Sequence, residues 1–302
     1  MRVVVTGTEG QVARALFERA SAQGALITAV GRPDLDFLRP ETIAPVIRAA
    51  APDVIVNAAA YTAVDQAEAE PDLAASVNGH GAAAVAAVAA DLDVPIIHLS
   101  TDYVFNGDLH RPYYETDPVG PVSAYGRTKL AGEQAVSAAT RNHVIFRTAW
   151  VYSPFGKNFV KTVLRLAATR DELSIVADQH GSPTSALDIA DGILTVCRNL
   201  VSRPADDSLR GVFHMTGSGF TTWAGFAAHI LQESARRGGP QAQIKAIGTI
   251  DYPTPAKRPT NSRLDCSKLL RVHNVTLPDW QTSLRACVAR LVEEHSVEGK
   301  VQ

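Results

Sequence analysis

Short apolar runs rich in β-branched residues alternate with helical segments along the first half of the chain, and this alternation restricts the fold more than any other feature. Five strands are predicted, at Arg2–Thr6, Leu26–Val30, Asp53–Asn57, Pro95–Leu99 and His143–Phe146. The helices predicted between them cover Val12–Gln23, Pro40–Ala50, Pro71–Leu92 and Ser123–Thr140. Strands joined by helices of this length form βαβ crossovers, which build a parallel sheet with helices on both faces. We therefore expect an α/β fold with a Rossmann-like, doubly wound parallel sheet.

The alternation becomes looser after about residue 150. The predicted elements there are helices at Asn158–Arg170, Ser185–Leu200, Thr222–Arg237 and Asp279–Val292, a strand at Gly211–Met215 and a proline-rich loop at Asp251–Pro259. We expect residues 1–150 to form a dinucleotide-binding Rossmann domain. Residues 151–302 are expected to form mainly a smaller α/β substrate-binding lobe, with some segments returning to the first domain.

Composition narrows the classes of protein to consider. The chain has 302 residues, 46% of them hydrophobic, so it can bury a sizeable core, and its net charge of −2 argues against nucleic-acid and anionic membrane partners. Three widely spaced cysteines give neither a disulfide framework nor a metal-site spacing. The apolar stretch around Gly81–Ala90 is too short to span a bilayer, and Met1-Arg2 runs directly into a strand without a signal peptide. The sequence therefore predicts a cytoplasmic protein without a membrane segment.

A glycine-rich turn follows the first predicted strand. The pattern G-x-x-G-x-x-A places Gly7 and Gly10 ahead of Gln11 and Val12, where the next helix begins. Glycines let the backbone turn sharply and approach a pyrophosphate, and the helix N-terminus offers N–H groups to it. Because the pattern lies between a strand and a helix, it predicts a dinucleotide site.

The end of the second predicted strand bears on the choice of dinucleotide. An acidic residue there would bind the adenosine ribose of NAD, but the chain has Arg32, which can face a 2′-phosphate or can simply be a solvated surface residue. Asp36 and Phe37 come close after it, near the expected adenine. The sequence favours NADPH, with NADH as a weaker substitute. Small residues after the third strand, Ala58 and Ala59, would let the dinucleotide lie close to the backbone, and Tyr61 is assigned to the same site.

Tyr125 and Lys129 are four residues apart in a predicted helix, so their side chains share one face. A phenol exchanges protons poorly at neutral pH unless a cation stabilises its anion, and Lys129 can do this while also holding the nicotinamide ribose. Thr101 follows the fourth predicted strand, where the sites of parallel sheets gather, and its hydroxyl can bond a substrate carbonyl. These three residues predict a carbonyl reductase.

Seven stretches resemble the family of dTDP-4-dehydrorhamnose reductases, within the extended short-chain dehydrogenase/reductase superfamily. They are GTEGQV (7–12), PDVIVNAAAYTAVDQAE (52–68), STDYVFNG (100–107), AYGRTKLAGE (124–133), FRTAWVY (146–152), DQHGSPT (178–184) and YPTPAKRPTNSRLD (252–265). The resemblance implies that Thr101, Tyr125 and Lys129 are catalytic and that NADPH reduces the C4 ketone of dTDP-4-dehydro-L-rhamnose. It also implies a sugar-binding role for Asp102, Tyr103 and Trp150.

Two arginines and one tryptophan allow alternative interpretations. Arg258 and Arg263 are candidates for binding the substrate diphosphate, because guanidinium groups suit phosphate oxygens, but an ion pair between lobes or at the surface is nearly as well supported. Trp223 lies at helical spacing among apolar residues and is expected in the core rather than in the site.

The sequence departs from the family pattern at two positions. The metal that bridges dimers in the best-known members is held by glutamates, which align with Ala15 and Leu187 here. We therefore expect no metal, and a monomer or a homodimer that is not bridged by one. Three alternatives stay open: a reductase of another dTDP-4-keto-6-deoxy sugar, a nucleotide-sugar dehydratase or epimerase, and a non-catalytic NADP-binding subunit like the methionine adenosyltransferase β subunit. The dehydratase lacks support because Tyr103 stands where an Asp-Glu pair needs its glutamate.

Overall fold

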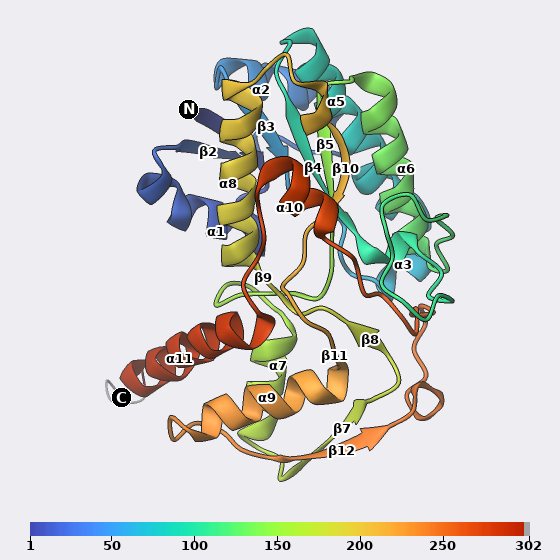
Figure 1. The fold of residues 1–302 in the computed structure, drawn as a ribbon, viewed down its shortest axis with the longest axis vertical. Coiled ribbons are helices and arrows are strands. Elements are labelled where there is room, and N and C mark those ends of the chain that lie inside the picture. Colours follow the sequence, from blue (N-terminus) through green and yellow to red (C-terminus); the bar gives the residue numbers. More distant parts are fainter. Residues whose placement is uncertain (299–302) are drawn as a thin grey trace.

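A parallel six-stranded sheet forms the centre of the protein. In this computed structural model, which describes residues 1–298, the strand order is β10-β5-β4-β3-β1-β2 (Figure 1). The strands are β1 (Arg2–Thr6), β2 (Leu26–Val30), β3 (Val54–Asn57), β4 (Ile96–Thr101), β5 (His143–Thr148) and β10 (Gly211–His214). Every pairing between neighbours is parallel. The predicted Rossmann-like fold is confirmed.

Helices cover both faces of the sheet, and successive strand residues point to opposite faces. On one face, Val3 and Val5 pack against α1 (Gln11–Ala20) and α8 (Ala186–Ser202). On the other face, Val4 packs in a cluster that includes residues of α2 (Ile43–Ala49), α5 (Ala82–Asp91) and α6 (Ala124–Ala139). Both faces are therefore buried, which explains why these strands are apolar throughout rather than alternating.

The second half of the chain contributes to both parts of the molecule. Helices α7 (Phe159–Ala167), α9 (Trp223–Ala235) and α11 (Trp280–Glu298) surround a second core with a parallel pair of strands, β7 (Glu172–Val176) and β12 (Gln243–Ile247), in the lower part of Figure 1. In contrast, α8, β10 and α10 (Ser267–His273) lie with the main sheet. The division at residue 150 stays a prediction.

The structure corrects several predicted elements. Strand β4 extends past Leu99 to Thr101, and the sequence analysis missed β7, β12 and α10. It also missed the two-residue strands β6 (Val151–Tyr152), β8 (His180–Gly181), β9 (Thr184–Ser185) and β11 (Thr221–Thr222). The first predicted helix ends at Ala20 and continues as a 3₁₀ turn. Strands β7 and β12 pair only with each other, so they lack the long buried runs that revealed the central strands.

The helix predicted at Pro71–Leu92 is present, but its apolar part is longer than the stretch around Gly81–Ala90 that the sequence analysis considered. It runs through α4 (Pro71–Ala75), a π-helical segment (Ser76–Gly81) and α5, and within residues 1–298 it is the one helix that meets the length and composition of a membrane span. Half of the apolar window is buried inside the protein, and Val85, Ala86 and Ala89 pack against the sheet. These contacts are those of a core helix, which passes the same test.

A buried ion pair ties α6 to the sheet. Glu133 on α6 binds Arg147 on β5 with N–O distances of 2.7 and 3.0 Å, and each side chain is only 5% exposed. The Ser100 hydroxyl on β4 also donates to the Glu133 carboxylate. Removing one partner of such a pair leaves an uncompensated charge in a medium that solvates it poorly.

We predict that Glu133→Gln lowers the free energy of unfolding by about 3–5 kcal/mol, because Arg147 stays charged and buried. Urea titration followed by circular dichroism measures this loss. Glu294→Gln, in the exposed pair with Arg290, is the matched control and should cost less than about 1 kcal/mol. Equal losses in the two variants would contradict the structural role of the buried pair.

Candidate active site

A cavity of about 800 Å³ opens at the carboxyl ends of the central strands. Gly7 occupies the turn after β1 with φ +92°, a conformation that favours glycine, and Gly10 caps the start of α1. All the residues that the sequence analysis assigned to the cofactor line this one cavity: Gly7, Gly10, Gln11, Val12, Arg32, Asp36, Phe37, Ala58, Ala59, Tyr61 and Lys129. A dinucleotide site needs such a glycine cradle at a helix N-terminus, so the residues present fit this class of cofactor.

Polar contacts fix the floor of the cavity. The Thr6 hydroxyl donates to Asn57 at 2.7 Å and accepts from the backbone N–H groups of Ala58 and Ala59, each at 3.1 Å. Gln11 bonds Ser153 and Asn158 and thereby ties the glycine turn to the start of α7. The ends of β1 and β3 are therefore held together beneath the place where a dinucleotide would lie.

The rim expected to meet the adenosine ribose carries opposite charges. Arg32 is exposed, and the hydrogen bonds and ion pairs found among residues 1–298 do not involve it. Asp36, on the same rim, is paired with Arg39 at 3.6 Å, which offsets the negative charge of this carboxylate. This arrangement leaves the Arg32 guanidinium available to an anionic group.

Thr101 and Tyr125 come together from two different elements. Thr101 ends β4 and accepts a hydrogen bond from the backbone N–H of Tyr103 at 3.2 Å. Tyr125 lies in the first turn of α6, and its phenol lies close enough to the Thr101 side chain for that side chain to favour the ionised phenol. Burial raises the pKa of Tyr125 to about 12, and the nearby Thr101 side chain opposes this shift. The phenol therefore holds its proton at neutral pH and can act as a donor.

Two residues outside the predicted set fix the start of α6. Ser123 caps the helix by accepting from the N–H of Gly126 at 3.1 Å, and Glu68 accepts from the N–H of Ala124 at 2.7 Å. A carboxylate in this place also complements the positive end of the helix dipole. The S-x-x pattern before the helix signals the cap, but no local pattern reveals Glu68, which lies 56 residues away.

Lys129 lies one turn after Tyr125 and is buried. Its ammonium group donates to the carbonyl of Leu99 at 2.6 Å. Burial lowers the pKa of Lys129 to about 8, and the carboxylate of Glu133 on the same helix opposes this shift. The side chain lines the same cavity as the glycine turn, where it can reach a bound dinucleotide.

The two arginines assigned to the diphosphate lie in different surroundings. Arg258 forms a two-pronged ion pair with Asp65, at 2.7 and 3.0 Å, and so fastens the proline-rich loop to the segment after β3. Arg263 bonds Asn261 and the carbonyl of His110 and lines a second hollow of about 480 Å³ rather than the cavity of the glycine turn. Arg258 thus forms an ion pair of the kind that the alternative interpretation expects, whereas Arg263 has hydrogen-bond partners and no ion pair among the described residues.

Trp150 belongs to an aromatic stack at the edge of the second core. It has φ +47°, and its ring lies 3.6 Å from the ring of Trp223 at an angle of 10°. Gly181 leaves room for the Trp150 indole, because a Cβ there would meet the ring. Trp223 is partly buried: it packs against the second core, as the sequence analysis expected, and it also stacks on Trp150.

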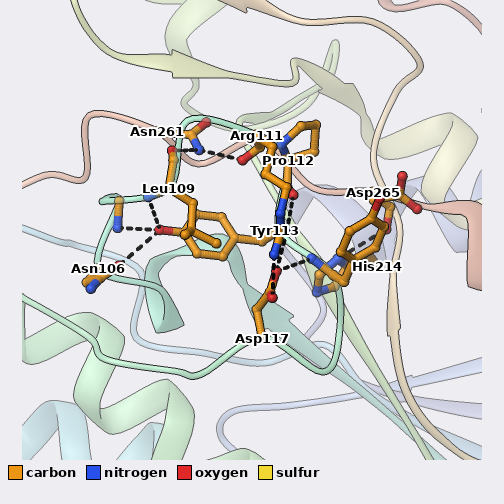
Figure 2. Close-up of polar contacts among 11 residues, drawn as sticks. Asn106, Leu109, Arg111, Pro112, Tyr113, Asp117, His214, Asn261 and Asp265 are labelled. Carbon is orange, nitrogen blue, oxygen red and sulfur yellow. Dashed lines mark hydrogen bonds and ion pairs between the residues drawn. The ribbon is translucent and has the colours of Figure 1, made fainter.

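The segment 106–117 is joined to residues 261–265 by a dense set of hydrogen bonds. Figure 2 shows Tyr113 at the centre: its hydroxyl donates to Asn106, and its backbone carbonyl accepts from the N–H of Asp265. Asn261 donates to the carbonyls of Leu109 and Arg111 at 2.6 and 2.9 Å. These contacts seat the C-terminal segment, including Ser262, beside the end of β4.

Comparisons with known proteins identify the family. The family model described as the RmlD substrate binding domain matches residues 1–293. A protein of Sinorhizobium fredii named dTDP-4-dehydrorhamnose reductase is 51% identical over 300 residues, covering 99% of each chain. This chain belongs to the dTDP-4-dehydrorhamnose reductase family. The protein of that name from Escherichia coli K12 is 42% identical, covering 96% of this chain and 98% of its own.

Solved structures of family members are similar over almost the whole chain. The dTDP-4-dehydrorhamnose reductase of Bacillus anthracis, in complex with NADP, has a TM-score of 0.87 at 33% identity, covering 96% of this chain and 99% of its own. The Clostridium acetobutylicum protein has a TM-score of 0.86 at 35% identity, with the same coverage. A UDP-glucose 4-epimerase of Thermus thermophilus, at 20% identity and a TM-score of 0.75, shares the fold.

We predict that Gly126→Ala disrupts the site without altering its chemical groups. A Cβ at Gly126 would collide with the Tyr103 carbonyl oxygen, so α6 would have to move away from the segment that carries Thr101. A misplacement of about 1 Å can cost about 100-fold in rate, which we expect in kcat, with little change in dinucleotide affinity. Steady-state kinetics and dinucleotide titration measure the two quantities.

Gly120→Ala is the matched control, because a Cβ there makes only an ordinary contact with Asn106. Its kcat should stay close to that of the parent. A Gly126→Ala variant with parental kcat would show that the close approach of α6 is not needed.

Proposed function

We propose that this protein uses NADPH to reduce the C4 ketone of dTDP-4-dehydro-L-rhamnose, giving dTDP-L-rhamnose. The observation that carries the proposal is the contact between Thr101 and Tyr125, with Lys129 on the same helix face, at the edge of the dinucleotide cavity. Relatives 40–51% identical over nearly the full chain that are named dTDP-4-dehydrorhamnose reductase support the substrate. The solved relative in complex with NADP supports the cofactor.

The chain's own residues act on the substrate oxygen. NADPH, when bound, supplies the hydride. Tyr125 donates its proton to the oxygen as negative charge develops there, and the Thr101 hydroxyl bonds the same oxygen. Lys129, whose side chain lines the cavity, would hold the nicotinamide ribose, and its positive charge favours the tyrosinate that forms when Tyr125 gives up its proton.

Five residues are proposed to bind the sugar nucleotide. Asp102 and Tyr103 lie in the turn after Thr101, and Tyr103 meets the Tyr125 ring edge-on at 5.9 Å. Trp150 follows β5, the strand next to β4. Arg258 would exchange its ion pair with Asp65 for the diphosphate. Its positive charge lowers the pKa of Tyr103, so Arg258 lies within electrostatic reach of this phenol. Arg263 would contact the nucleotide only from the second hollow.

We also propose that the protein acts in the cytoplasm as a monomer or homodimer without a bridging metal, on a dTDP-sugar and not on nucleic acid or a membrane. Ala15 is fully buried in the core between α1 and α8, and Leu187 is partly buried beside it. Neither side chain can ligate a cation, so the arrangement does not support a metal-bridged dimer built on these positions.

One assay tests the proposed reaction. NADPH oxidation is followed with dTDP-4-dehydro-6-deoxy sugars, with and without a 3,5-epimerase, and the product is identified. We expect turnover with the L-rhamnose precursor, and we expect Tyr125→Phe to lower kcat by about 10²–10⁴-fold while the fold is kept, because the ring stays and the proton donor is lost. Turnover of a different 4-keto sugar alone, or parental kcat in Tyr125→Phe, would refute the proposal.

Arg32 tests the choice of cofactor. A hydrogen bond to a charged group contributes about 1.5–3 kcal/mol, so NADPH should be preferred by about 10-fold or more in kcat/KM. Arg32→Ala should raise KM for NADPH far more than KM for NADH. Arg19→Ala, in the last turn of α1 whereas the cavity lies at the first turn, serves as the control for loss of a surface arginine. Equal use of both cofactors by the parent protein would contradict this interpretation of Arg32.

A further inference from the structure

Asp102 is a buried carboxyl group beside the Thr101–Tyr125 pair. It begins the 3₁₀ turn after β4, and only 3% of its surface is exposed. Its Oδ1 atom accepts a hydrogen bond from the Thr101 hydroxyl at 2.9 Å, whereas its Oδ2 atom is buried and makes no well-formed hydrogen bond among the described residues. The Ser262 hydroxyl, which donates to the His180 carbonyl at 3.3 Å, lies close enough to favour ionisation of this carboxyl group. Binding of the sugar by Asp102 does not by itself explain why this carboxyl group is hydrogen-bonded to the Thr101 hydroxyl.

The Thr101 hydroxyl has one proton, so its partners decide where that proton points. When Asp102 is ionised, it accepts the proton, and Thr101 can only accept from Tyr125. When Asp102 is protonated, it can donate to Thr101, which already accepts from the Tyr103 backbone N–H. The Thr101 proton is then free to point toward Tyr125 or toward the substrate oxygen.

We propose that Asp102 carries a proton into the reaction and passes it through Thr101 to Tyr125, which makes it a positioning and relay residue. This inference rests on the proposed function. After Tyr125 protonates the substrate oxygen, the O–H bond of Thr101 breaks and one forms on the tyrosinate. At the same time, the O–H bond of Asp102 breaks and one forms on Thr101. Tyr125 and Thr101 end neutral, Asp102 ends as a carboxylate, and no electron pair leaves the three residues.

The protonation tendencies of the groups agree with this direction. Burial raises the pKa of Asp102 to about 7, although the Ser262 and Thr101 hydroxyls oppose the shift, and burial raises that of Tyr125 to about 12. A tyrosinate therefore takes the proton from Asp102. The carboxylate regains a proton from water once the product leaves.

The titratable groups that interact electrostatically with Asp102 are Tyr103 on its own turn and Tyr125 on α6, and the Ser262 hydroxyl from the C-terminal segment favours its ionisation. The cations on the surrounding elements have other partners. They include Lys129, bonded to the Leu99 carbonyl, Arg127 and Arg147, paired with Glu68 and Glu133, and Arg258, paired with Asp65. Because the pKa of the carboxyl group is raised, its proton is present below pH 7 and is lost as the pH rises above that value.

Asp102→Asn tests the relay, because the amide keeps the size and can still donate to Thr101 but cannot transfer a proton. With saturating substrate and NADPH, stopped flow measures the first turnover and a steady-state assay measures kcat. The first turnover uses the proton already on Tyr125, so we expect it at nearly the parental rate. We expect kcat to fall to about one tenth of the parental value or below. The decline of kcat above about pH 7 should be absent in this variant.

Ser262→Ala is the matched control. It keeps the proton on Asp102 and removes a hydroxyl that favours ionisation, so the alkaline decline of kcat should move to higher pH. If Asp102→Asn slows the first turnover and kcat by the same factor, or slows neither, the relay is wrong. If the parent protein does not oxidise NADPH with any dTDP-4-keto sugar, the proposed function itself is wrong.

Discussion

The site depends on how closely helix α6 lies against the end of strand β4 and the segment that follows it. Gly126 lets the helix approach the Tyr103 carbonyl, and Gly132 lets it approach the Asn78 carbonyl, because a Cβ at either position would collide with that oxygen. Glu133 then binds Arg147 and Ser100 from the same helix. The result is that Tyr125 meets Thr101, although the two residues come from elements that the chain joins only through a long loop.

The C-terminal segments complete what the parallel sheet begins. Arg258 fastens the proline-rich loop to Asp65, and the strand-like contacts of Tyr113 with residues 263–265 hold the next segment against the loop after β4. Ser262, in this segment, donates to the His180 carbonyl and lies close enough to Asp102 to favour its ionisation, whereas burial raises the pKa of the carboxyl group.

The sequence predicted the central strands and the residues that line the dinucleotide cavity, because these depend on local signals. Gly7 and Gly10 lie in a short motif, and buried parallel strands show as apolar runs. The roles of Glu68 and Asn261 depend on contacts 56 and about 150 residues away, which no local pattern records. The same limit explains why Arg258 and Arg263 were ambiguous: their partners, Asp65 and the His110 carbonyl, are distant in sequence.

In the proposed reaction, hydride reaches C4 of the sugar while Tyr125 protonates its oxygen. Reduction with NADPH deuterated on its transferable hydrogen, followed by NMR of the purified product, tests this most directly. We expect dTDP-L-rhamnose with deuterium at C4 and nowhere else. Deuterium at another carbon, or a product with the opposite configuration at C4, would contradict it.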